Sequence, residues 1–183
     1  MTSMRSWRAC HARGGSLVDS KQNKDVQLND LYRDTVLDHF RSPRGTKPID
    51  RVDIRREGNN PLCGDKLEMS IKMSDDTIED IEVHCKGCAI SVASTSMLAE
   101  LVPGMKKDDA LKLAEGFKQM MHGQPAPEGL DIGDLDSLEG VKDFPVRVKC
   151  ALLAWMTIID ALRADARDDD QTGAMTSTED KQD

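Results

Sequence analysis

Apolar and polar residues alternate with a period of two in two segments near the middle of the chain. Apolar side chains occupy every second position from Leu67 to Met73 and again, mostly at odd positions, from Ile78 to Cys85. This alternation is typical of a strand that buries one face and exposes the other. The Ser-Asp-Asp sequence at residues 74–76, between the two segments, is typical of a turn. The pattern therefore predicts an antiparallel hairpin.

Helical spacing of apolar residues appears on both sides of this hairpin. The expected helical segments cover residues 29–40, 89–102, 107–121 and 145–162, with a short helical turn at 134–138. A loop follows the first of them and contains a short strand around Val52–Ile54. These elements predict an α+β fold, with a small antiparallel β-sheet packed against about four to five α-helices.

The two ends of the chain lack apolar periodicity. Residues 1–24 carry a net charge of +4 and residues 164–183 a net charge of −5, and both are rich in small or polar residues. Such segments cannot bury enough apolar surface to offset the entropy lost on ordering them. We therefore expect a disordered N-terminal extension over residues 1–27, in which Cys10 is an unengaged thiol. One folded domain over residues 28–163 and a disordered acidic tail over residues 164–183 follow it.

Composition excludes several classes of protein. The 183 residues carry a net charge of −8, which argues against nucleic-acid binding because phosphate contacts need clustered positive charge. No run approaches the roughly 18 apolar residues that a membrane helix needs. The five cysteines are an odd number in a chain that shows no apolar core of a signal peptide, so we expect reduced thiols rather than a disulfide framework. We expect a cytoplasmic protein with no membrane or nucleic-acid partner.

Three of the cysteines lie at the ends of predicted elements. Cys63 lies in a turn flanked by Pro and Gly before a strand, Cys88 directly before a helix, and Cys150 in the first turns of the last helix. Ligands at such positions can converge without disturbing the packing, and a helix N-terminus favours the thiolate form. With Asp65 as the fourth donor, these thiolates would complete a tetrahedral zinc site. Their spacing matches no zinc-finger pattern, so buried thiols without a metal remain an alternative on this reasoning alone.

The other cysteine of the predicted strand and the histidines have simpler interpretations. Cys85 continues the inward-facing series of its strand, so we expect a small core residue, although it forms a Cys-x-x-Cys motif with Cys88. His84 points to the opposite face and is expected in solvent. His39 and His122 end helices, where a positive charge is favourable.

Four motifs together resemble the NifU/IscU-like family of iron–sulfur cluster assembly proteins. They are Leu37-Asp38-His39-Phe40-x-x-Pro43-Arg44, Asn60-Pro61-x-Cys63-Gly64-Asp65, Gly87-Cys88-Ala89-Ile90-Ser91 with Ala93-Ser94, and Phe144-Pro145-Val146-Arg147-Val148-Lys149-Cys150-Ala151. The similarity covers residues 28–162 and leaves only the two ends unmatched. The resemblance implies the family's fold and a metal site formed by Cys63, Asp65, Cys88 and Cys150.

The closer resemblance is to the SufU branch of this family. Lys149 precedes the last cysteine, where IscU-type scaffolds carry a histidine, and the stretch that includes Asp131–Leu135 resembles the SufU insertion. The resemblance implies a tightly bound Zn²⁺ and a sulfur-acceptor role. It also implies a pyridoxal-phosphate-dependent cysteine desulfurase of the SUF system as the partner, with SUF scaffold proteins downstream.

The chemistry then assigns a role to each residue of the site. Cys63, in its turn, is the expected acceptor, since a thiolate must attack the outer sulfur of the desulfurase persulfide. Arg147 and Lys149 either steer the partner and stabilise the persulfide anion or form only a solvated cationic edge.

We expect a zinc-dependent sulfurtransferase that stimulates a desulfurase and is not itself one. One alternative is a scaffold on which an iron–sulfur cluster, with iron in place of zinc, is assembled and passed to apo-proteins. A second alternative is a structural zinc interaction module.

Overall fold

The computed structural model describes residues 33–125, 132–165 and 175–177. Residues 33–41 form the first helix. The elements that follow are β1 (Ile54–Asn60), β2 (Asp65–Ser74), β3 (Thr77–Lys86), α2 (Ala89–Leu101), α3 (Lys107–Met121), the 3-10 helix η1 (Gly133–Asp143), α4 (Pro145–Asp165) and β4 (Met175–Ser177). Cys10 and the extension predicted over residues 1–27 lie outside the described residues.

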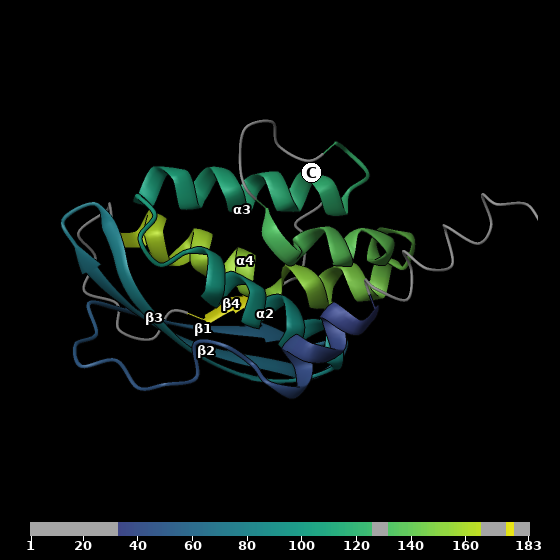
Figure 1. The fold of residues 1–183 in the computed structure, drawn as a ribbon, viewed down its shortest axis with the longest axis horizontal. Helices are drawn as coiled ribbons and strands as arrows, with labels where there is room; N and C mark the ends of the chain where they lie inside the picture. Colours follow the sequence, from purple (N-terminus) through teal and green to yellow (C-terminus); the bar gives the residue numbers. More distant parts are fainter. Residues whose placement is uncertain (1–32, 126–131, 166–174, 178–183) are drawn as a thin grey trace, which may run out of the picture.

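The strands form one sheet with the order β3-β2-β1-β4. β2 pairs antiparallel with both β1 and β3, and the register places Leu67 opposite Cys85 and Ser74 opposite Thr77. The inward side chains of β2 and β3 are buried beneath α2, α3 and α4, which all lie on one face of the sheet (Figure 1). The predicted α+β class and the predicted hairpin are confirmed.

Strand β1 is longer than the sequence pattern predicts. The expected short strand around Val52–Ile54 is in fact seven residues, Ile54–Asn60, and its buried positions after Ile54 are Arg56, Gly58 and Asn60. An added Cβ at Gly58 would collide with Thr157 Oγ1 and lie 3.1 Å from Leu153 Cδ1, so α4 packs directly on the backbone here. A strand whose inward face carries a cation, a glycine and an amide has no apolar alternation to detect.

The acidic tail also differs from its prediction. α4 continues to Asp165, and residues 175–177 form β4, which pairs parallel with β1 so that Asn59 lies opposite Ser177. The disorder predicted for all of residues 164–183 therefore does not hold for this strand. Backbone hydrogen bonds to an edge strand order these three residues, and such bonds need no apolar pattern in the sequence.

Removing β4 is expected to have a small effect on stability and a local effect on β1. Deleting residues 166–183 should lower the free energy of unfolding by no more than about 1–2 kcal/mol, because each backbone hydrogen bond contributes about 1 kcal/mol net. Amide hydrogen exchange should speed up at Glu57–Asn59, the residues that face β4. Unchanged exchange there would contradict the pairing.

A buried hydrogen-bonded chain joins α2 to α4. Trp155 is completely buried, packs against Phe117 with ring centroids 4.9 Å apart, and donates its indole N–H to Ser94 Oγ at 3.0 Å. Ser94 in turn donates its hydroxyl to the carbonyl of Ala151 at 2.6 Å. Because the indole N–H is satisfied, the ring is buried without an unpaired donor. The contacts hold the N-terminal half of α4, which carries Cys150, against α2.

Candidate metal centre

The turn between β1 and β2 presents Cys63 at the surface. The carbonyl of Asn60 accepts the backbone N–H groups of Cys63 at 3.3 Å and Gly64 at 2.8 Å. The side-chain oxygen of Asn60 accepts the N–H of Leu62 at 3.3 Å. Gly64 has φ +71°, a left-handed conformation that a glycine adopts without strain. The turn is therefore organised around Asn60, and Cys63 is exposed.

Asn60 also ties this turn to α4. Its side-chain N–H donates to Cys150 Sγ at 3.4 Å, and the residue is completely buried. In the sequence, Asn60 belongs to a motif but has no predicted role. An Asn-Pro pair at the end of a strand signals a turn, but a contact with a cysteine 90 residues away has no local signal.

Three of the four predicted ligands come together at this turn. Cys63 Sγ lies 3.3 Å from Cys150 Sγ. A carboxylate oxygen of Asp65 lies within 4.8 Å of both sulfur atoms. Cys150 and Asp65 are buried, so the group has a closed inner side and one exposed member, Cys63.

The carboxylate of Asp65 is only half satisfied. Oδ1 accepts the backbone N–H of Cys88 at 3.0 Å, whereas Oδ2 is buried and has no hydrogen-bond partner among the described residues. An unpaired buried carboxylate oxygen costs free energy unless a cation or donor reaches it. A metal ion held with the neighbouring sulfurs would supply that partner, so the residues fit a bound cation.

Cys88 lies beside this group rather than inside it. It is the N-cap of α2, is half-buried, and is not among the three residues whose ligand atoms all lie within 4.8 Å of one another.

Burial raises the pKa of the Cys150 thiol above its ordinary range, and Cys63, Asp65 and Cys88 raise it further. All these effects disfavour deprotonation of Cys150. A bound divalent cation would instead favour its thiolate form.

Gly87 lets Asp65 and the start of α2 approach each other. A Cβ built on Gly87 would lie 2.6 Å from Asp65 Oδ1 and 2.7 Å from its carboxyl carbon. Any other residue at this position must therefore displace the carboxylate that accepts the Cys88 N–H.

We predict that Gly87→Ala weakens metal binding without unfolding the domain. The displaced carboxylate should lower zinc affinity by about tenfold or more, the range seen when partners that orient ligands are lost. Competition with a chromophoric chelator measures the affinity. Gly140→Ala is the matched control, because an added Cβ at Gly140 meets no atom within 4 Å. Equal zinc affinity in the two variants would contradict the role of Gly87.

The other residues named from the sequence lie outside this group. Cys85 is half-buried and packs against the core, and burial raises the pKa of its thiol. His84 is exposed, as predicted, and pairs with Glu82 at 2.8 Å. Arg147 is exposed and Lys149 is partly buried. His122 is an exposed C-cap of α3.

His39, which the sequence places at a helix end where a positive charge is favourable, is buried in the structure. It is 1% exposed, its Nδ1 lies 2.8 Å from Ser96 Oγ, and its Nε2 lies 3.0 Å from Asp134 Oδ2. The predicted short turn at 134–138 is an eleven-residue 3-10 helix, η1, and its N-terminal end meets His39. This histidine therefore joins the first helix to α2 and η1.

Large apolar side chains are exposed near the cysteines in the chain. Leu62 is 60%, Phe144 62% and Val146 56% exposed, next to Cys63 or within six residues of Cys150.

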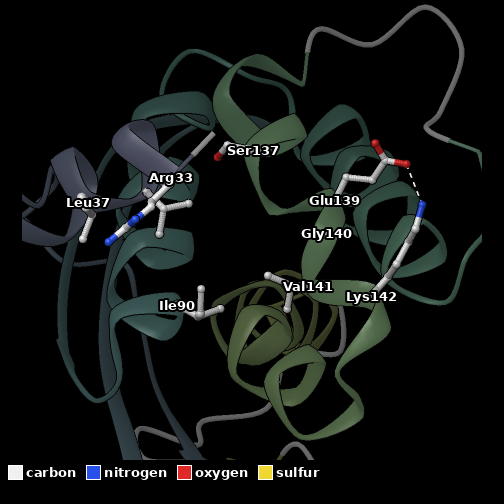
Figure 2. Close-up of a pocket in the computed structure, with 9 residues that line it drawn as sticks. Arg33, Leu37, Ile90, Ser137, Glu139, Gly140, Val141 and Lys142 are labelled. Carbon is white, nitrogen blue, oxygen red and sulfur yellow. Dashed lines mark hydrogen bonds and ion pairs between the residues drawn. The ribbon is translucent and has the colours of Figure 1, made fainter. Parts of the chain in front are cut away.

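A separate pocket of about 530 Å³ lies between the first helix, the start of α2 and η1 (Figure 2). Val36, Leu37, Ile90 and Val141 form its apolar wall, and no predicted ligand lines it.

Comparison with known proteins places this arrangement in a family. The model of the NifU-like N-terminal domain matches residues 31–161. The chain belongs to the NifU-like N-terminal domain family. It is 37% identical over 134 residues to the zinc-dependent sulfurtransferase SufU of Bacillus subtilis, covering 73% of this chain and 90% of that protein. It is 40% identical over 140 residues to the iron–sulfur cluster assembly scaffold protein IscU of Streptococcus pyogenes, covering 76% and 87%.

Solved structures of the family agree with the fold. FiSufU of Fervidobacterium islandicum, whose description names the SUF system, has a TM-score of 0.65 at 32% identity, covering 70% of this chain and 93% of that one. The N-terminal NifU-like protein of Brucella abortus has a TM-score of 0.70 at 25% identity, covering 78% and 99%. The resemblance to the SufU branch stated from the motifs is confirmed. Within the described residues, no helix is both long enough and apolar enough to cross a membrane.

Proposed function

We propose that this chain is a zinc-bound sulfur acceptor that takes persulfide sulfur from a cysteine desulfurase of the SUF system and stimulates that enzyme. The observation that carries the proposal is one exposed cysteine on a turn, 3.3 Å from a buried cysteine and beside a buried carboxylate with an unpaired oxygen. The name of the Bacillus subtilis relative, a zinc-dependent sulfurtransferase, supports it.

The proposed zinc ligands are Cys63, Asp65, Cys88 and Cys150. The sulfur atoms of Cys63 and Cys150 and a carboxylate oxygen of Asp65 already converge. Cys88 reaches the same group through Asp65, which accepts its backbone N–H. Zinc would supply a positive charge that keeps the cysteines deprotonated. The unpaired Oδ2 of Asp65 supports the carboxylate as a ligand.

Cys63 is the proposed acceptor because it is the exposed member of the set. It is exposed on a four-residue turn, residues 61–64, whereas Cys150 is buried inside α4 and Cys88 caps α2. The Cys63 thiolate attacks the outer sulfur of the desulfurase persulfide, the sulfur–sulfur bond breaks, and the desulfurase cysteine leaves as a thiolate. Cys63 then carries the persulfide, with no external oxidant or reductant required.

The surface near Cys63 suits a protein partner. Leu62, Phe144 and Val146 are exposed apolar side chains, and Arg147 lies in the same stretch as the last two. Exposed apolar groups with polar neighbours are typical of interaction sites. We assign Arg147 and Lys149 to steering an acidic partner or stabilising the persulfide anion. We propose residues 28–163 as the folded unit that acts in this way.

A scaffold for iron–sulfur cluster assembly is the second candidate. It is favoured by the name of the Streptococcus pyogenes relative, which is 40% identical. Both candidates use the same three cysteines. A purely structural zinc module is disfavoured, because such sites favour cysteine and histidine ligands, whereas the proposed set includes the carboxylate of Asp65.

The test combines metal analysis with persulfide mapping. Protein purified without oxygen should contain about one zinc per chain. After incubation with the desulfurase and cysteine, mass spectrometry should find the added sulfur on Cys63. Stoichiometric iron without zinc would favour the scaffold. Sulfur on Cys88 or Cys150, with Cys63 unmodified, would overturn the assignment of the acceptor.

A further inference from the structure

The strand register places Cys85 next to the candidate metal centre. Lys66 lies opposite Lys86 and Leu67 opposite Cys85 in the β2–β3 ladder. Continued by one step, the same register places Asp65 opposite Gly87. The geometry at Gly87 agrees, because an added Cβ there would collide with the Asp65 carboxylate.

Asp65 and Cys85 therefore share the inner face of the sheet. Residues directly opposite in an antiparallel pair point to the same side, and diagonal neighbours lie about 7–8 Å apart. Asp65 and Leu67 are buried, and Cys85 packs against the same core. Gly87, the next residue on this face of the strand after Cys85, contributes no side chain beside the Asp65 carboxylate. Burial raises the pKa of the Cys85 thiol, and the nearby charges of Asp65 and Cys88 raise it further.

Zinc and an iron–sulfur cluster make different demands on such a group. A single zinc ion draws its ligands to about 2.0–2.3 Å and accepts a carboxylate beside thiolates. A cluster contains several iron and sulfide ions, so its ligands stand farther apart, and it is held by four cysteine thiolates. Cys63, Cys88 and Cys150 provide three thiols, and Cys85 is the fourth thiol at this end of the sheet among the described residues.

We propose that Cys85 replaces Asp65 as the fourth ligand when this chain holds an iron–sulfur cluster, so that zinc and cluster use different ligand sets. The proposal rests on the three shared cysteines of the proposed function. Ligation of Cys85 releases its proton to solvent and transfers no electron, so no further reactant is needed. The Cys85 thiol lies 3.4 Å from Ser91 Oγ, a contact that it would exchange for iron.

The test is a pair of variants with opposite expected effects. Wild type, Cys85→Ser and Asp65→Asn are each prepared as zinc protein. Each is separately reconstituted without oxygen from the apo-protein, ferrous iron and inorganic sulfide. Zinc affinity is measured by chelator competition, and cluster lifetime by the decay of visible absorption. The electron paramagnetic resonance spectrum of the reduced cluster reports the ligand set. Cys10→Ser is the control for loss of one thiol.

We expect each variant to impair only one of the two bound forms, zinc or cluster. Cys85→Ser should bind zinc like wild type but lose its cluster severalfold faster and show a changed spectrum. Asp65→Asn should bind zinc more weakly and keep the wild-type cluster lifetime and spectrum. A cluster in Cys85→Ser with unchanged lifetime and spectrum would overturn the proposal. Cluster loss in Asp65→Asn as fast as in Cys85→Ser, or a wild-type chain that forms no cluster, would also do so. The proposed function would survive those results, since zinc content and persulfide on Cys63 test it separately.

Discussion

Cys63→Ala is expected to abolish stimulation of the desulfurase while leaving the domain folded. Cys63 is exposed on a turn, so its loss removes the proposed acceptor thiol and creates no cavity in the core. Sulfide release from cysteine by the desulfurase, with and without each variant, measures the effect. Stimulation should fall to the level of the desulfurase alone. The melting temperature of metal-free protein should change by no more than a few degrees.

The control for Cys63→Ala separates the loss of the thiol from a change elsewhere in the surface of the same turn. Leu62→Ala, next to Cys63 in the same turn and 60% exposed, keeps all the proposed ligands. It should weaken binding to the desulfurase without abolishing stimulation at saturating concentration. Full stimulation by a well-folded Cys63→Ala protein would be fatal to the proposed acceptor role.

Cys150→Ala is expected to fail in a different way, by losing zinc and stability together. Cys150 is completely buried, accepts a hydrogen bond from Asn60 and lies 3.3 Å from Cys63. A metal that binds only to the folded state raises the free energy of unfolding by about 3–4 kcal/mol when free zinc is 100 to 1,000 times the dissociation constant. The variant should lose most of this amount. Thermal unfolding with and without a chelator measures it.

The informative comparison is the stabilisation that zinc gives to each variant. The wild type should unfold at a lower temperature after chelation, and Cys150→Ala should show almost no difference between the two conditions. Cys85→Ala removes another partly buried thiol and should retain the zinc-dependent difference. If chelation destabilised Cys150→Ala as much as wild type, Cys150 would not be a ligand.

The hairpin could be predicted because its own residues bury it. Leu67, Met69 and Ile71 alternate with polar side chains and lie beneath the helices. The face that the sequence pattern predicts to be buried is therefore the face that packs against the core. β1 has the same geometry without this signal, because Arg56 and Gly58 occupy its inward face. The space beneath α4 requires Gly58, and only the folded structure shows that space.

The convergence of the candidate site could be anticipated only in part. Cys63 and Asp65 are two residues apart, so their proximity follows from the turn. Cys150 reaches them through the packing of α4 on β1, which brings Asn60 to its sulfur. The roles of Asn60 and Gly87 depend on contacts between distant segments, and so does the burial of His39, which contacts Ser96 and Asp134. Local sequence patterns carry no information on such contacts.

The pairing of β4 with β1 has a practical consequence for work with this protein. β4 ends at Ser177, and its partner Asn59 precedes Asn60, which organises the turn that carries Cys63. An affinity tag or fluorescent fusion attached after Asp183 would be separated from this strand by only the six residues 178–183. A polyhistidine tag there would compete for the same zinc. Purification handles for binding assays therefore belong at the N-terminus, with a cleavage site before Leu28.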